Sequence, residues 1–407
     1  DIAFHDGSKL TADDVVFSVK RITDRSFGSP QLGQFDKITD AVALSPTKVK
    51  LTTSGAYPAL LAQLVKLSIV PKAVVEAVGK DAFNLKPIGS GPYKFDSWQR
   101  GVQVQLSRND TYWGTKAPFP TVVFRAVPDA ATRLANLQAG SSDLVVTLDA
   151  DQAGQLKTSS KAKALIGLTE RVAYVRLNTT KPPFDNPKLR LAAAYALDKQ
   201  AMVDGLLGGY DKPVPELLTP AVFGWVDGIK APEYDLAKAK ALVAEAGAAS
   251  KAEIDLATAP VFDQRIVQAI QQMLTEAGFN VKIAMSDMAT YLKRAQAGPE
   301  ATSLLSFGRW SCACQDADGV LFPLLHKSSG WSAYRNPKVD SLLEEARATL
   351  DKDKRLVAYK QVHEIVATDV PVVPLYQAVV IYGAAKNLSF QPTPNESMFI
   401  NRMGWRD

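Results

Sequence analysis

The chain has 407 residues, 46% of them hydrophobic and 22% charged, with a formal net charge of +5. These values are typical of a globular protein of two or three domains with a large core. The small positive net charge is not concentrated in basic runs, so we do not expect the protein to bind nucleic acid or a membrane surface. No apolar run approaches the ~20 residues of a membrane-spanning helix, so we expect a chain that does not span a membrane.

The first half of the chain predicts short helices and strands separated by Gly and Pro turns. Asp1–Asp6 is expected to be the end of a strand, and Thr11 and Asp14 form a capping box that begins a helix running to about Arg25. Asp129 is expected to cap a helix that ends at Gly140. Further strands are expected over 41–44, 48–52, 102–106, 122–127 and 144–148, and a helix over 57–67.

The glycine-rich segment Ile88–Tyr93 is expected to be a structural turn and not a phosphate-binding loop. A phosphate-binding loop needs a helix directly after it, whereas Pro92 here leads into a run that predicts a strand.

The second half predicts an α/β lobe in which helices, glycine stops and strands alternate. Asn186 and Pro187 are an N-cap and first helical residue, and this helix is expected to run to Gly208-Gly209. Further helices are expected over 235–247, 262–277, 337–350 and 352–369, and strands or extended segments over 174–178, 280–284, 303–307 and 371–382.

The stretch Trp310–Gly319 is expected to be a polar loop at the end of a buried strand, and it holds both cysteines of the chain. Loops held on a rigid strand often carry binding residues, although an ordinary surface loop is an equal alternative. Cys312 and Cys314 are expected to be free thiols, because a disulfide between them closes a very small ring and a soft-metal site would lack its other ligands. Asp316 and Asp318 would be the acid/base pair of a carboxylate-dependent hydrolase, the alternative of another class.

No other motif of catalysis or cofactor binding is present. The three histidines, His5, His326 and His363, are not at metal-ligand spacing, and there is no dinucleotide, phosphate-loop or serine-hydrolase motif. We therefore expect no catalytic residues, no metal and no cofactor.

A series of short motifs decides the class of protein. In chain order they are Phe4–Gly7 with Leu10–Phe17, Pro87–Tyr93, Arg108–Trp113, Leu137–Gly140 with Asp143, Leu177-Asn178, Pro183-Phe184, Arg190 with Ala196–Asp198, Tyr334–Asp340 and Pro371–Pro374. Taken together and in this order, they resemble the bacterial extracellular solute-binding proteins of family 5, the peptide, nickel and opine type.

The resemblance implies an α/β, two-lobed periplasmic-binding-protein-like fold (type II, cluster C) with an extra subdomain. Lobe I would comprise 1–172 plus 375–407, with the subdomain at about 35–115, and lobe II would comprise 173–374. Leu177, Asn178 and Pro374 would lie in the hinge. Family members carry some tens of residues before the first motif, including a signal peptide, which this sequence lacks.

The resemblance also implies a binding protein that is not an enzyme. It would capture a peptide or peptide-like solute between two lobes and deliver it to the permease subunits of an ABC importer. The protein would be a periplasmic, or extracellular and membrane-tethered, monomer. The expected ligand-binding residues are Arg309, Trp310, Ser311, Asp316 and Tyr376.

One position departs from the family. Peptide-binding relatives have an Asp three residues after the Trp of this loop, where it holds the peptide α-ammonium, and this chain has Ala313. A buried ammonium without a partner costs several kcal/mol, so an opine, an oligosaccharide or a metal chelate is the alternative ligand. A ligand-sensing or chaperone role on the same fold is a third hypothesis.

Overall fold

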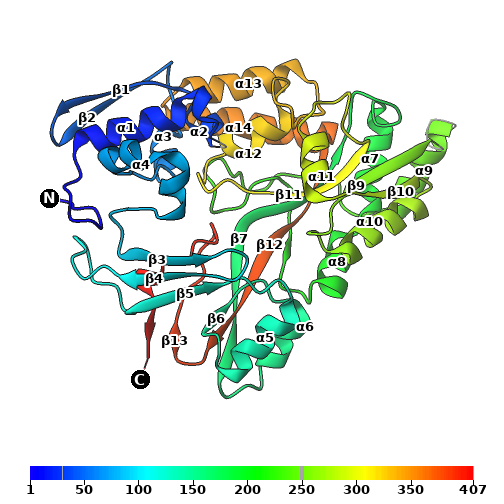
Figure 1. The fold of residues 1–407 in the computed structure, drawn as a ribbon. Helices are drawn as coiled ribbons and strands as arrows, with labels where there is room; N and C mark the ends of the chain where they lie inside the picture. The colour runs from blue at the N-terminus through cyan, green and yellow to red at the C-terminus, as the bar shows by residue number, and fades with distance from the viewer. Residues whose placement is uncertain (30, 248–251, 407) are drawn as a thin grey trace. The chain divides into compact units, whose positions relative to one another are not determined.

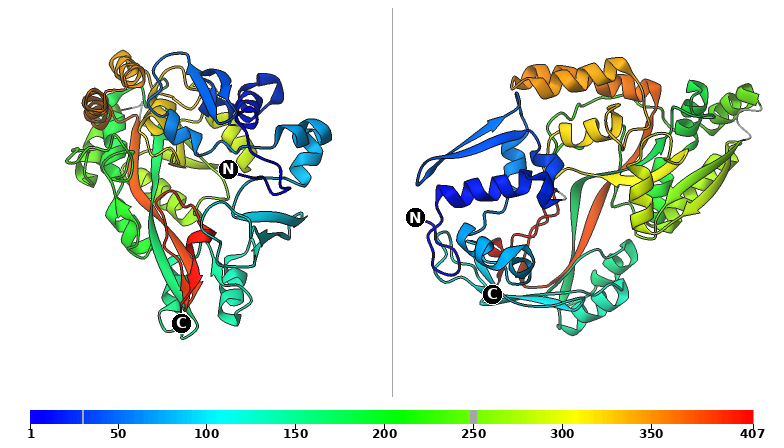
Figure 2. Two further views of the ribbon diagram at one scale, coloured as in Figure 1. Left: turned by 90° about the vertical axis from the view of Figure 1, so that its left-hand side faces the viewer. Right: turned by 45° about the horizontal axis from the view of Figure 1, so that its top comes forward.

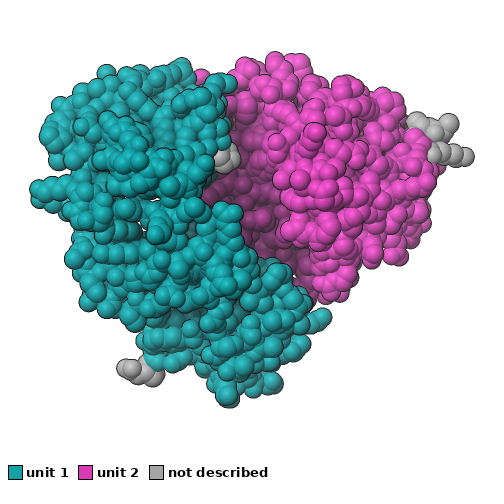
Figure 3. All heavy atoms as spheres, in the orientation of Figure 1, with its two compact units in different colours: residues 1–165, 381–392, 397–407 teal, residues 166–380, 393–396 magenta. Residues whose placement is uncertain are grey.

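The structure is a computed structural model that describes residues 1–29, 31–247 and 252–406. It divides into two compact units, coloured separately in Figure 3. Unit 1 comprises residues 1–165, 381–392 and 397–407, and unit 2 comprises residues 166–380 and 393–396. The chain passes from unit to unit at 165/166 and 380/381, within the same two strands in which the predicted lobes change over at 172/173 and 374/375, and again at 392/393 and 396/397.

Unit 1 contains three small antiparallel sheets, of which two are formed by segments adjacent in the chain. β1 pairs with β2, β3 pairs with β4 and β4 with β5, while β13 pairs with β14. The strands are β1 (Ile38–Ser45), β2 (Lys48–Thr53), β3 (Tyr93–Gln99), β4 (Gln103–Arg108), β5 (Thr121–Arg125), β6 (Leu144–Val145), β13 (Leu388–Ser389) and β14 (Gly404–Trp405).

The helices of unit 1 begin at the local signals that the sequence carries. The backbone N–H of Thr11 donates to Asp14 (2.8 Å) at the start of α1, and the side chain of Asp129 accepts the Thr132 N–H at the start of α5. The helices are α1 (Ala12–Thr23), α2 (Leu32–Phe35), α3 (Leu60–Leu64), α4 (Lys72–Leu85), α5 (Ala130–Ala139) and α6 (Ala150–Leu156), with 3-10 turns η1 (Arg25–Phe27) and η3 (Ile400–Arg402).

Unit 2 is built on a mixed sheet in the order β10-β9-β11-β7-β12, with β8 beside β12. β9, β10 and β11 are parallel to one another, whereas β11 runs antiparallel to β7. The strands are β7 (Ala162–Leu177), β8 (Lys212–Pro213), β9 (Glu253–Thr258), β10 (Asn280–Met285), β11 (Leu305–Trp310) and β12 (Val372–Ala385). The two long strands β7 and β12 run side by side and each continues into unit 1, where β12 pairs with β6 (Figures 1 and 2).

Two apolar cores fill unit 2. One packs the sheet against α7 to α11 and the other lies among α12, α13 and α14. The helices are α7 (Pro187–Ala196), α8 (Lys199–Leu206), α9 (Leu236–Ala246), α10 (Gln264–Glu276), α11 (Met288–Ala295), α12 (Asp318–Leu325), α13 (Pro337–Ala348) and α14 (Lys352–Asp369).

Five sequence expectations are wrong in detail. One is the strand expected over 144–148, of which only Leu144 and Val145 form β6. Only an isolated bridge between Ala3 and Lys9 stands where a strand end was expected at 1–6. The single helix expected from Pro187 to Gly208 is two helices, because Leu197 is extended and the Asp198 side chain accepts the Ala201 N–H to begin α8. The helix expected over 57–67 is shortened to α3. The loop expected to reach Gly319 ends at Ala317, and α12 begins at Asp318.

None of the helices in the described part of the chain is long and apolar enough to cross a bilayer.

Candidate functional site

The candidate site lies at the end of β11 in unit 2. Residues 305–308 of this strand are buried, Arg309 is exposed and Trp310 is half-buried. β11 pairs along its whole length with β7, but with β9 only at Leu305 and Ser306. The edge of β11 that faces β9 is therefore unpaired beyond Ser306, and the exposed Arg309 lies in this unpaired part.

Arg309 carries the cation of the site. Its side chain makes no hydrogen bond or ion pair with any residue of the described chain, and its guanidinium lies 5.8 Å from the centre of the Phe262 ring. An exposed guanidinium can donate two parallel N–H hydrogen bonds to one carboxylate group.

Trp310 is held in place from two sides. Its indole N–H donates to the carbonyl oxygen of Gly319 at 2.9 Å, and its ring meets the Trp331 ring edge to face with 4.8 Å between centroids. The indole thus packs beneath its own loop, and its partly exposed face is what remains for a ligand. Ser311, the next residue, is half-buried.

The two cysteines form a disulfide, Cys312–Cys314, so the expectation of free thiols is wrong. The physical reason is the backbone: the loop turns back on itself, the Gln315 N–H donates to the Cys312 carbonyl oxygen at 2.7 Å, and Gln315 has a φ of 49°. This turn brings the two Cα atoms to 5.0 Å, within the range that a disulfide spans. Ala313, between the cysteines, is exposed.

Asp316 is buried in an internal ion pair rather than presented at the surface. Its carboxylate accepts a hydrogen bond from the Arg355 guanidinium at 2.6 Å and another from the Asp318 N–H at 3.0 Å. Arg355 is itself buried and donates to the Ala346 carbonyl oxygen and the Tyr359 hydroxyl. The acidic group of the loop is thus engaged in holding the loop on α14.

Asp318 has a similar partner, because the Arg347 guanidinium lies 2.8 Å from its carboxylate. Each carboxylate of the supposed acid/base pair is therefore neutralised by its own arginine. Neither is placed as a poised general acid or base, and this geometry argues against the hydrolase alternative.

The other predicted residues lie deeper in unit 2. Tyr376 is 5% exposed on β12, opposite Pro213 of β8, and burial raises the pKa of its hydroxyl. Leu177 and Asn178 are buried where β7 ends, and the Asn178 side-chain amide donates to the Pro299 carbonyl oxygen at 2.8 Å. The structure thus brings Arg309, Trp310 and Ser311 together at the strand end and places these other residues in the core behind it.

The sequence expectations missed the segment that backs the loop. The Phe223 N–H donates to the Gln315 carbonyl oxygen at 2.9 Å, and the Ala317 N–H donates to the Phe223 carbonyl oxygen at 2.8 Å. Gly224 has a φ of +100°, and a Cβ there would lie 2.5 Å from the Ala317 Cβ. Only glycine fits at position 224, because it lies so close to the loop. The sequence around it, Phe223-Gly224-Trp225, has no periodic pattern and therefore does not show which segment of the chain it contacts.

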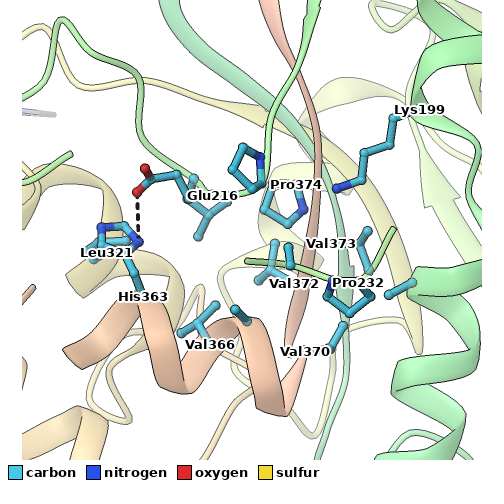
Figure 4. A pocket seen from close by; sticks show the side chains of 15 residues that line it. Lys199, Glu216, Pro232, Leu321, His363, Val366, Val370, Val372, Val373 and Pro374 are labelled. Atoms are coloured by element: carbon cyan, nitrogen blue, oxygen red, sulfur yellow. Dashed lines mark ion pairs between the residues drawn. The ribbon is translucent and has the colours of Figure 1, made fainter. Parts of the chain in front are cut away.

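Within the residues that the structure describes, each unit contains a cavity. The cavity of unit 2 has a volume of about 20 Å³, room for a water molecule and no more, and Lys199, Glu216 and His363 line it (Figure 4). That of unit 1 has about 550 Å³ between β5 and the C-terminal segment. Of its lining residues, Arg125 donates to the Ser141 carbonyl oxygen and Arg133 to the Val127 and Thr147 carbonyl oxygens.

Groups of His, Cys, Asp and Glu that would hold a metal ion are absent from the residues that the structure describes.

Comparison with known proteins points to one class. The model of the family "Bacterial extracellular solute-binding proteins, family 5 Middle" matches residues 1–332. Heme-binding protein A of Haemophilus influenzae is 29% identical, over 93% of this chain and 75% of that protein. The glutathione-binding protein GsiB of Shigella boydii is 27% identical, over 95% of this chain and 78% of the relative.

Solved structures agree with this class. The periplasmic binding protein DppA of Helicobacter pylori, in complex with the peptide STSA, has a TM-score of 0.85 and 27% identity, over 100% of this chain and 85% of that one. The protein AppA of Clostridium difficile, at 21% identity and a TM-score of 0.90, shares the fold.

Proposed function

The chain belongs to family 5 of the bacterial extracellular solute-binding proteins, and we propose that it serves an ABC importer by binding a peptide-like solute that carries a carboxylate. The observation that carries this proposal is Arg309, an exposed guanidinium at the end of a buried strand with no ion-pair partner in the described chain. The half-buried Trp310 and Ser311 beside it would add an aromatic face and a hydroxyl.

Tyr376 and Asp316 would take part indirectly in this proposal. Tyr376 lies in the core behind the strand end, and Asp316 anchors the loop through Arg355. The hinge would lie in β7 and β12, which would bend near Leu177, Asn178 and Pro374. The closure of two lobes on the solute stays a prediction.

The names of the relatives support a carboxylate-bearing solute. Glutathione, heme and peptides are the ligands in the printed names of three of them, and each of these molecules carries free carboxylates. By the same proposal the protein acts as a monomer in the periplasm and hands its solute to a permease.

A second candidate solute is favoured by Ala313. An alanine between the two cysteines offers no acid to a primary α-ammonium, so a carboxylate-bearing solute without that group, such as heme or an opine, fits this loop better than a dipeptide.

Thermal unfolding with a panel of solutes tests the proposal. Glutathione, a dipeptide and heme are added separately, and a true ligand at one hundred times its Kd stabilises the folded chain by about 2.7 kcal/mol. Arg309→Met should abolish the shift, whereas Arg335→Met, at another exposed arginine of unit 2, should preserve it.

Mass spectrometry of small molecules released on denaturation identifies a co-purifying solute. A released solute without any carboxylate, or a shift that survives Arg309→Met, would contradict the proposal.

A further inference from the structure

A second arginine, Arg171 of β7, lies diagonally across from Arg309 on the same face of the unit 2 sheet. β7 pairs with β11 so that Ala173 is opposite Arg309 and Val172 is opposite Trp310. Successive residues of a strand point to opposite faces, so Arg171, two residues from Ala173, shares the face of Arg309. Such diagonal neighbours lie about 7–8 Å apart, within reach of two long side chains.

The electrostatics of Arg309 agree with this placement. Partial burial lowers the pKa of the Arg309 guanidinium, and the positive charge of Arg171 lowers it further. Two acids within range of its charge, Asp211 and Asp263, have partners of their own. Asp263 forms an ion pair with Arg265 at 2.7 Å, and Asp211 accepts a backbone N–H of β12 at 3.0 Å. An acid that pairs with Arg309 must therefore come from a solute.

Arg171, in contrast, is occupied by a carboxylate of the chain itself. Its Nε and Nη2 atoms lie 2.9 Å and 2.8 Å from Oε1 of Glu396, which belongs to a short turn of unit 2, residues 393–396. Both contacts end on one oxygen, rather than on the two oxygens of a bidentate pair. The two side chains are 36% and 30% exposed, and an ion pair that water reaches in this way is weak.

The backbone of the turn is anchored independently of the Glu396 side chain. The Pro394 carbonyl oxygen accepts the Glu170 N–H of β7 at 2.8 Å, and the Glu396 N–H donates to the Thr393 carbonyl oxygen at 2.9 Å. Glu396 has a φ of 59°, a conformation in which residues other than glycine are uncommon. The Glu396 carboxylate can thus leave Arg171 by a change of side-chain rotamer, while the turn stays in place.

We propose that Arg171 is a second carboxylate-binding residue of the candidate site and that Glu396 competes with the solute for it. The preferred solute carries two carboxylates, one bound by Arg309 and the other by Arg171 after the Glu396 side chain turns away. This inference rests on the proposed function, because Arg309 is the first anchor. Once Arg309 holds one carboxylate, the second is confined close to Arg171, and this high local concentration favours displacement of a weak internal partner.

Protection of the two arginines from phenylglyoxal, a reagent for accessible guanidinium groups, tests the inference on the unaltered chain. The probes are malonate, succinate, glutarate and adipate, with butyrate as the matched monocarboxylate, all at constant ionic strength. Peptide mass spectrometry follows the modification of each arginine. We expect butyrate to protect Arg309 alone, and at least one dicarboxylate to protect both Arg309 and Arg171 at a lower concentration than butyrate needs.

Two variants shift the competition in opposite directions. Glu396→Gln removes the internal carboxylate, so Arg171 should react about threefold to fivefold faster without a probe, and the dicarboxylate should protect at a concentration lower by the same factor, as for loss of a solvent-accessible ion pair. Arg171→Met should reduce the protection of Arg309 by the dicarboxylate to that given by butyrate. Glu245→Gln, which alters the exposed ion pair with Lys188, is the control and should behave as the unaltered chain.

The inference is overturned if the dicarboxylates protect Arg309 but not Arg171, if butyrate protects Arg171 as well as they do, or if Glu396→Gln behaves like Glu245→Gln. Each of these outcomes leaves the proposed function standing, because Arg309 still binds a carboxylate. If neither butyrate nor any dicarboxylate protects Arg309, the proposed function is contradicted together with this inference.

Discussion

At the scale of single residues, the loop depends on charges that are satisfied inside unit 2. Asp316 and Arg355 are 7% and 4% exposed, and the hydrogen bond between them is 2.6 Å long. A buried ion pair adds little over an apolar pair, but removal of one partner leaves an unpaired charge in a medium of low dielectric constant. The acid of this loop is therefore structurally indispensable whatever the solute is.

Asp316→Ala should lower the free energy of unfolding by about 3–5 kcal/mol, because Arg355 is left buried without its partner. The control is Glu245→Ala, which removes an exposed partner of Lys188 and should cost less than about 1 kcal/mol. Chemical denaturation measures both. If the two variants lose similar amounts of unfolding free energy, the ion pair between Asp316 and Arg355 is not shielded from water as the structure indicates.

Gly224→Ala tests the close approach between the 216–226 segment and the loop. Its Cβ would meet Ala317 at 2.5 Å and Tyr359 at 3.0 Å, in addition to the cost of a positive φ. Gly228→Ala is the matched control, since Gly228 has a φ of +78° and open space around its Cβ. We expect the unfolding free energy of Gly224→Ala to fall about 1–3 kcal/mol below that of the control, and equal losses would contradict the packing described.

At the scale of elements, one face of α14 organises the back of the site. Arg355, Tyr359 and His363 are four residues apart, so they lie in a row along the helix. Arg355 binds the loop, Tyr359 contacts Arg355, and His363 binds the 216–226 segment. A single helix thus supports both segments that meet at Phe223, while β11 supplies the exposed residues in front.

Reduction of the Cys312–Cys314 disulfide should loosen this loop only modestly. A ring closed over three residues restrains the unfolded chain little, which corresponds to about 1–2 kcal/mol in the chain-entropy model. We expect dithiothreitol to lower the melting temperature of the unaltered chain but not of the Cys312→Ser, Cys314→Ser double variant. Alkylation of both cysteines without a reductant, followed by mass spectrometry, would refute the disulfide.

At the scale of the whole molecule, two buried titratable groups couple folding to pH. They are Glu216 and His363, whose Oε2 and Nδ1 atoms lie 3.0 Å apart with both side chains 2% exposed. In the folded chain the pair holds one proton from about pH 4 to about pH 8. In the unfolded chain the carboxyl and the imidazole titrate separately, near 4.5 and 6.5. The unfolded pair thus holds two protons below pH 4.5, one between 4.5 and 6.5, and none above 6.5.

Stability therefore should fall as pH rises from about 6.5 to about 8, where only the folded chain retains the proton. The loss from this pair is about 2 kcal/mol, with no further change from it above pH 8. Between 4.5 and 6.5 the pair contributes no slope; from about 4.5 to about 4 stability falls slightly as pH falls, and below about 4 both states hold two protons and the slope is again zero. Denaturation across this range should show the alkaline loss in the unaltered chain and not in Glu216→Gln, and identical profiles would contradict it.

The sequence by itself determined the local elements and the class of protein. N-caps such as Asp129, Asn186 and Asn336, and glycine stops such as Gly140 and Gly247, act within one turn of helix, so these helix starts and ends were predicted correctly, whereas the end of α7, which has no glycine, was not. The ordered motifs from Phe4 to Pro374 predicted the solute-binding family, which the family match over 1–332 confirms.

Only the tertiary structure decided what each residue of the loop does. Asp316 meets Arg355 across 39 residues, and His363 meets the Gly224 carbonyl oxygen across 139, and no local pattern encodes such separations. The disulfide likewise depends on a backbone turn that the spacing of two cysteines does not reveal. Capping and periodicity act along the chain, whereas ion pairs and burial depend on which segments pack together, and that is settled only when the chain is folded.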